Sequence, residues 1–115
     1  MEIEQWQDHR GTHPVEDFIM EQSSKAQAKI AWTIGLLEIQ GTNLLRTDHM
    51  KRLHGYKPPL YELRIHAMGK FYRILFVIRD NTAWFLHGFT KQTDKTPRNH
   101  IEIAAKRSEE FTSKL

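Results

Sequence analysis

The sequence predicts an α+β fold, with three consecutive strands placed between helices. Two observations carry this prediction. Apolar residues recur at helical spacing before residue 41 and after residue 96, whereas residues 60–91 hold three strand-like segments in a row. The length of 115 residues is typical of one domain, so residues 1–115 are expected to form a single unit.

The first elements are a short strand and two helices. The segment "EIEQWQ" alternates apolar and polar residues, which predicts an edge strand over residues 2–7. Pro14 suits the first position of a helix, and the acidic residues that follow suit its first turn. A second helix is expected from Ser24 to Gly41, where the glycine suits the C-terminal cap. Trp32 and Leu36 widen its apolar stripe toward a second contact.

The next segments change from helical to strand patterning. Residues 41–59 are irregular and basic, and we expect no regular element there. "LYELRIH" alternates as a half-buried strand does, and "FYRILFVIR" is apolar on both faces, which predicts a central strand. "RDN" then predicts a tight hairpin turn before "TAWFLHGFTK".

A last helix is expected after the loop "KQTDKTP". Thr96 is predicted to cap this helix, with Pro97 in its first turn. One face of the helix stays small or apolar, and it comprises Ile101, Ala104, Ser108, Phe111 and Leu115.

Strand alternation sorts the side chains of the sheet into two faces. The face under the helices is expected to hold Tyr61, Leu63, Ile65, Ile74, Phe76, Ile78, Trp84 and Leu86. The opposite face is expected to hold Glu62, Arg64, His66, Arg73, Phe85, His87, Phe89 and Lys91. A bulge at Gly88 would change the last of these positions. Such an open face would be a basic groove with aromatic patches, which suits phosphates and unpaired bases.

The charge distribution is consistent with a polyanionic partner. Residues 1–40 carry three Lys/Arg against seven acids, whereas residues 41–98 carry eleven against four. Basic side chains that neutralise phosphates release counterions, although a solvated basic surface is the plain alternative. The chain has no cysteine, which excludes a thiolate nucleophile and a cysteine-based zinc site. No metal site, no cofactor and no membrane span are expected, and a cytoplasmic protein is the simplest interpretation.

Arg73 is the first candidate site residue because it interrupts an apolar strand. A structural interpretation pairs it with Glu62, and a functional one directs its guanidinium to a phosphate. Arg64 carries the same two interpretations. His54 and His66 are candidates for proton transfer, whereas His87 beside Gly88 is more typical of a structural histidine.

Several motifs together resemble a known family. The run "LYELRI", the run "FYRILFVIRDNTAWFLHGFTKQTDKTP", the piece "IEIA" and the N-terminal "GTHPVEDFI" resemble the RelE/ParE toxin superfamily, and its phage-derived HigB-like branch in particular. The resemblance implies two N-terminal helices packed on a small curved antiparallel sheet, with a C-terminal helix. It also implies the toxin of a type II toxin-antitoxin pair, a metal-independent and ribosome-dependent mRNA endoribonuclease.

The resemblance also implies roles for individual residues. Arg73 occupies the arginine that contacts the scissile phosphate, and Arg64 stands near a catalytic basic residue of the family. Lys91 and Lys95 match basic positions of the loop after the last strand. The tyrosine that some relatives carry in the last helix is missing, and His100 is the residue nearby. The further residues expected to bind substrate are His87, His66, Lys51, Arg52, His54 and Phe89.

The expected partners are mRNA, the ribosome and a cognate antitoxin, a HigA-like helix-turn-helix protein. The edge strand at residues 2–7 and the apolar tail near Phe111 are candidate antitoxin contacts. Two alternatives stay open: a ParE-like inhibitor of DNA gyrase that cuts no RNA, and a small basic nucleic-acid-binding module. The inhibitor needs no convergent set of Arg64, Arg73 and Lys91. In the binding module, charge reversals would weaken binding uniformly.

Overall fold

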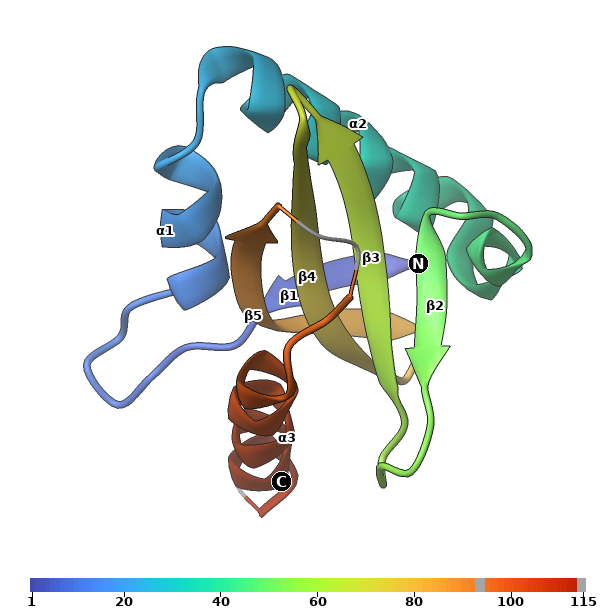
Figure 1. Cartoon of the computed structure of the whole chain (residues 1–115). Coiled ribbons are helices and arrows are strands. Elements are labelled where there is room, and N and C mark those ends of the chain that lie inside the picture. Colours follow the sequence, from blue (N-terminus) through green and yellow to red (C-terminus); the bar gives the residue numbers. More distant parts are fainter. Residues whose placement is uncertain (93–94, 114–115) are drawn as a thin grey trace.

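Five strands form one sheet, in the order β1-β5-β4-β3-β2 (Figure 1). The computed structural model describes residues 1–92 and 95–113, with side chains as far as residue 110. The elements in chain order are β1 Glu2–Gln5, α1 Pro14–Met20, α2 Ser24–Gln40, the 3-10 helix η1 Gly41–Arg46, β2 Met50–Leu53, β3 Leu60–Ala67, β4 Lys70–Arg79, β5 Thr82–Lys91 and α3 Arg98–Ser113.

The predicted α+β fold is confirmed, and β4 is the central strand. The pairs β2–β3, β3–β4 and β4–β5 are antiparallel, but β1 joins the edge beside β5 in parallel. The sheet is therefore mixed. The prediction of no regular element in residues 41–59 was wrong, because η1 and β2 lie there. β2 has four residues, too few for a strand pattern, and it is defined by its pairing with β3.

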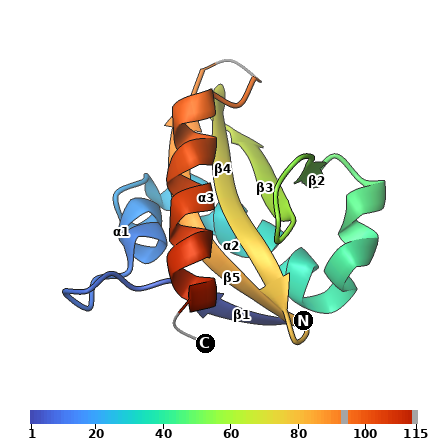
Figure 2. The same ribbon diagram turned by 90° about the horizontal axis from the view of Figure 1, so that it is seen from below.

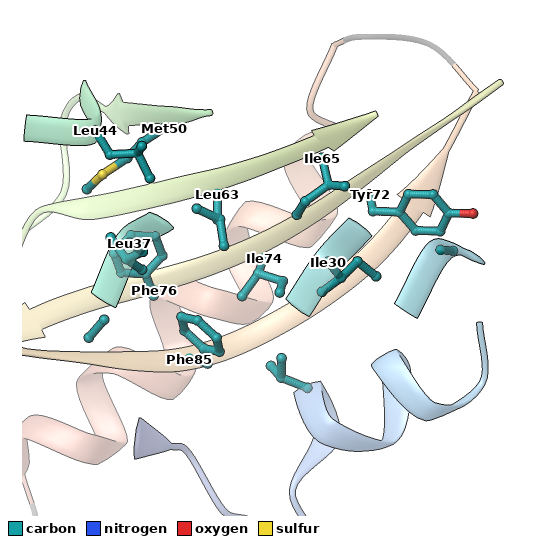
Figure 3. Packing of buried hydrophobic residues seen from close by; sticks show 13 residues of the cluster. Ile30, Leu37, Leu44, Met50, Leu63, Ile65, Tyr72, Ile74, Phe76 and Phe85 are labelled. Carbon is teal, nitrogen blue, oxygen red and sulfur yellow. The ribbon is translucent and has the colours of Figure 1, made fainter. Parts of the chain in front are cut away.

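The helices cover both faces of the sheet (Figure 2). α1 and α2 lie on one face, where the core includes Ile30, Leu63, Ile74 and Phe76. Figure 3 shows these side chains meeting between the strands and α2. α3 lies across the other face, where Leu75, Leu86 and Phe89 form a second core with Ala104.

α3 changes the expectation of an open basic face. Because α3 buries the middle of that face, the polar side chains can reach solvent only beside it. Ala104 and Ser108 are buried on the predicted inner face of α3, whereas the side chains of Phe111 and Leu115 lie outside the described part. The helix begins at Arg98, two residues after Thr96, so the predicted cap position was wrong.

The local signals for α1 and α2 are confirmed. Pro14 is the first residue of α1, and the Ser23 hydroxyl accepts a hydrogen bond from the Ala26 N–H at 3.2 Å. Gly41 ends α2 with a φ of 55°, a conformation that glycine adopts without strain. Trp32 and Leu36 were expected to widen the apolar stripe of α2 toward a second contact; Leu36 packs against the core, whereas Trp32 is 53% exposed. It lies edge-on to His49, with ring centroids 5.7 Å apart.

A bulge in β5 decides which of its side chains face α3. Leu75 pairs with His87 and Phe76 pairs with Phe85, which leaves Leu86 as the extra residue. Trp84 and Leu86 therefore pack on the α3 side, and Phe85 packs under α1 and α2. These three assignments were the reverse of the prediction. His87, Phe89 and Lys91 keep the predicted face, because the bulge precedes them rather than occurring at Gly88.

Gly88→Ala is expected to lower the free energy of unfolding by about 1–3 kcal/mol, the usual cost of overpacking. A Cβ at this position would lie 2.5 Å from Cδ2 of Phe18, so the Phe18 ring of α1 would have to shift from its place on the sheet. Gly35→Ala in α2 is the matched control. A Cβ there meets nothing within 4 Å, and we expect a gain of about 0.5–1 kcal/mol from helix propensity. Urea unfolding checks both values, and a Gly88→Ala protein as stable as wild type would contradict the close approach.

Candidate functional site

A buried carboxylate, Glu62, holds the two candidate arginines together. Its side chain is 1% exposed, and its Oε1 lies 3.3 Å from Nε of Arg64 and 3.5 Å from Nε of Arg73. The Thr96 hydroxyl donates to Oε2 of the same carboxylate. Glu62 thus ties β3 and β4 to the loop that precedes α3.

The two arginines differ in how far they reach solvent. They are directly opposite each other in the β3–β4 register, yet the Arg64 side chain is 23% exposed and that of Arg73 is 2% exposed. Arg73 also donates from Nη1 to the Tyr72 carbonyl at 3.4 Å, and its guanidinium lies 5.2 Å from the centre of the Phe71 ring. The geometry agrees with the structural interpretation of Arg73, whereas Arg64 is the arginine at the surface.

Two hollows meet at Arg64, and together they form what we call the Arg64 groove. Each has a volume of about 470 Å³. The first is lined by Lys29, Asp48, His49, Arg64, Ile65, His66, Phe71 and Arg73. The second is lined by Lys51, Leu53, Glu62, Arg64, Lys95, Thr96 and Ile101.

The groove exists because β2 is shorter than β3. β2 pairs with β3 as far as Met50 and Leu63, so the rest of β3 has an open edge that points toward α2 (Figure 1). The backbone N–H of Arg64 donates to the His49 carbonyl at 2.8 Å and closes the pairing there. Residues from α2, the loop before β2 and the loop before α3 therefore gather around one arginine.

The other predicted residues divide into those in the groove and those outside it. His66 and Lys95 line the groove, and Lys51 lines its second hollow. Arg52 alternates with Lys51 and lies on the opposite face of β2, and His54 follows the strand without lining either hollow. His66 stacks on Phe71, with centroids 4.5 Å apart and the rings 14° from parallel.

His87 and Phe89 lie in a separate cluster under α3. Phe89 is 4% exposed, and His100 of α3 stacks flat on it at 4.0 Å. His87 Nε2 lies 2.8 Å from His100 Nδ1, and Arg107 Nη1 donates to the Leu86 carbonyl at 2.7 Å. Phe89 is therefore occupied by a protein ring in this structure, rather than open to a base.

The hydrogen bonds of this cluster fix the tautomer of both histidines. Arg107 Nη1, which can only donate, lies 3.4 Å from His87 Nδ1, so that nitrogen accepts. His87 then carries its proton on Nε2 and donates to His100 Nδ1.

Burial, with the charges of Arg107 and His100, lowers the pKa of His87 to about 4. Burial and the charge of Lys91 lower the pKa of His100 as well. The His87 imidazole is therefore neutral at pH 7.

The stability of the protein is expected to fall as the pH is lowered from 6.5 toward 4. The unfolded state binds a proton at His87 near the ordinary pKa of 6.5, whereas the folded state resists it down to about 4. The stability that the folded protein gains by keeping His87 neutral is fully present above pH 6.5. Urea unfolding of wild type and His87→Gln at pH 7.5 and 5 measures the effect, and the variant should show a smaller pH dependence. An equal dependence in both proteins would exclude His87 as its source.

Within the described residues, no group of three or more His, Cys, Asp or Glu side chains is arranged to hold a metal ion. The helices of the described chain are likewise too short or too polar to cross a membrane. The groove offers guanidinium, ammonium and imidazole groups beside the carboxylates of Asp48 and Glu62, a set of side chains that can bind an anion at Arg64.

Sequence reasoning missed several residues of the site. Lys29, Asp48 and His49 come from segments that gave no strand or motif signal, and the open edge of β3 brings them together. Phe71 lies two residues before Arg73 in β4, so strand alternation predicts that both side chains lie on the same face of the sheet. Thr96 was predicted only as a helix cap.

The comparisons with known proteins place the chain in a family. Residues 17–109 match the family model described as "Phage derived protein Gp49-like (DUF891)". No curated protein and no solved structure matched the chain. The matched region runs from α1 into α3 and includes every residue of the Arg64 groove. The chain therefore belongs to the family of Gp49-like phage-derived proteins, a RelE-like toxin family.

Proposed function

We propose that this protein is the toxin of a type II toxin-antitoxin pair, a HigB-like endoribonuclease that cuts mRNA on the ribosome without a metal ion. The observation that carries the proposal is the Arg64 groove, in which lysines flank a surface arginine on both sides. Membership in a RelE-like family supports the same class of activity.

RNA supplies its own nucleophile for this reaction. The 2′-hydroxyl attacks the adjacent phosphate, and the 5′-oxygen leaves with a proton. A protein must align the 2′-oxygen, stabilise the added negative charge and assist proton transfer. In the proposal Arg64 contacts the scissile phosphate, while Lys51 and Lys95 hold the backbone on one side and Lys29 holds it on the other.

Arg73 has a different role in this proposal from the one that the family resemblance implies. Because it is buried against Glu62, it acts through that carboxylate and not on the phosphate. Two guanidinium groups contact this one carboxylate, so Arg73 helps to hold Glu62 in the position where it contacts Arg64. Lys91 lies opposite Phe71 and its charge acts on His100, which places it at the α3 side of the site.

Mapping of new RNA 5′ ends after brief induction tests the proposed activity. A translation-coupled nuclease produces discrete cuts within coding regions, and these cuts should disappear when translation is blocked before induction. Growth arrest without new ends would contradict the nuclease proposal and favour an inhibitor of DNA gyrase. Uniform loss of RNA binding on charge reversal, without cleavage by the wild type, would favour a binding module.

The antitoxin is proposed to bind the outer edge of β1. Glu2 and Trp6 direct their backbone N–H groups to the carbonyls of Asn81 and Phe85, so the alternate groups of β1 point away from the sheet. An extended segment can add to such an edge. Copurification of the tagged chain with the product of the neighbouring gene tests the pairing, and failure to form a complex would count against it.

A further inference from the structure

We propose that the hollow lined by Lys29 and Asp48 is a base-specific site, and that it binds guanine in a single-stranded RNA. This inference rests on the proposed function, since it takes RNA as the ligand of the Arg64 groove. It adds a specificity for one base. Asp48 accepts hydrogen bonds from the base, and the base stacks on His66, which itself lies on Phe71.

The hollow has the size and position that a nucleotide needs. Its volume of about 470 Å³ lies within the range of small-molecule sites. Arg64 borders both hollows, so a phosphate at Arg64 leaves room for one nucleotide on each side of it. The base in the first hollow is then the one next to the scissile bond.

An aromatic stack borders this hollow. His66 lies on Phe71 with the rings 14° from parallel, and the guanidinium of Arg73 lies 5.2 Å from the centre of the Phe71 ring. The His66 side chain is exposed, so a base can continue the stack on its outer side. Stacking binds any base, because every base has a π face, and it therefore does not select among them.

Asp48 supplies the selectivity. The other charged side chains that line the hollow are Lys29, Arg64 and Arg73, which donate hydrogen bonds but cannot accept them. Asp48 is the one carboxylate among the lining residues that the structure describes, and its side chain is exposed. A carboxylate accepts two parallel hydrogen bonds. Guanine presents N1–H and N2–H side by side on its Watson–Crick edge, whereas adenine, cytosine and uracil place an acceptor beside their donor.

The test is an NMR titration of the ¹⁵N-labelled protein with 2′-O-methyl tetranucleotides, which cannot be cleaved by attack of the 2′-oxygen. The set is UUGU, UUIU, UUAU, UUCU and UUUU, in which inosine (I) is guanine without its N2 amino group. We expect UUGU to bind about tenfold more tightly than UUIU, with amide shifts at Asp48, Arg64 and His66. Asp48→Asn should remove this preference and keep the weaker binding of UUUU.

Asp80→Asn is the matched control, because Asp80 lies on the β4–β5 turn and its side chain is 94% exposed. This variant should keep the preference for UUGU. Equal binding of UUGU and UUIU by wild type would overturn the guanine site and leave the nuclease proposal standing. Absence of shifts in the groove with every oligonucleotide would contradict both. The comparison of UUGU with UUIU uses wild-type protein, so it tests the selection of guanine even if Asp48→Asn fails to fold.

Discussion

Replacing Glu62 with alanine is expected to lower the free energy of unfolding by about 3–5 kcal/mol. The carboxylate is 1% exposed and contacts both Arg64 and Arg73, of which Arg73 is itself buried. Without Glu62, Arg73 would keep its charge in a low-dielectric site beside a second guanidinium. The Thr96 hydroxyl would also lose its acceptor. Urea unfolding at pH 7 measures the change.

Glu102→Ala is the control for this prediction. Glu102 pairs with Arg98 at 3.2 Å on the surface of α3, and an exposed pair at this helical spacing contributes about 0.3–0.5 kcal/mol. A second substitution, Arg73→Met, made in the Glu62→Ala background, should restore part of the lost stability by removing a buried charge that has lost the Glu62 carboxylate. If Glu62→Ala cost no more than Glu102→Ala, the buried carboxylate would not be what holds the arginines.

Arg64→Ala is expected to reduce RNA cleavage by about 10²–10³-fold, the usual effect of losing one donor to a developing negative charge. Arg64 is the partly exposed arginine where the two hollows meet, so its guanidinium is the group placed to meet a phosphate. Single-turnover cleavage on translating ribosomes measures the loss, because it reports the chemical step apart from product release.

Arg79→Ala is the matched control for the loss of a positive charge. Arg79 lies at the far end of β4, is 45% exposed, and pairs with Asp80 at 3.9 Å, so this variant should cut RNA at the wild-type rate. Arg73→Ala should differ from both, since it removes a buried partner of Glu62 and lowers stability as well as cleavage. Wild-type cleavage by Arg64→Ala would remove Arg64 from the mechanism and end the case for the groove as the active site.

Glu62 makes the site and the fold depend on each other. One carboxylate contacts arginines of two strands and accepts a hydrogen bond from the loop that carries Lys95. The hydrogen bond from Thr96 to Glu62 therefore holds the start of the segment before α3 against the groove. A change at Thr96 would alter where Lys95 lies without removing any charge.

Predictions from the sequence were confirmed at several positions where a local pattern decides the structure. The starts of α1 and α2, the Gly41 cap, the central place of β4 and the Asp80–Asn81 turn were all predicted. Each depends on residues close together in the chain, such as Pro14 at a helix start or two successive positive φ angles in a turn. The likeness to RelE toxins was confirmed at the level of the family.

The misses were features that depend on distant partners. β2 is a strand because it pairs with β3. Leu86 is the extra residue of the bulge, and its position depends on the register between β4 and β5. Phe89 was predicted to bind substrate, but the His100 ring of α3 stacks on it. Alternation along one strand cannot reveal a neighbour that belongs to another element.

The sequence by itself determined the α+β class, the helix boundaries set by Pro14 and Gly41, and the basic residues from which a site had to come, because periodicity, turn chemistry and charge are local properties. The tertiary structure alone decided which of these residues meet. It buried Arg73 against Glu62, left Arg64 at the surface between two hollows, and brought Lys29 and Asp48 to the open edge of β3. The physical reason is that burial and pairing are set by the packing of segments far apart in the chain, which no single segment encodes.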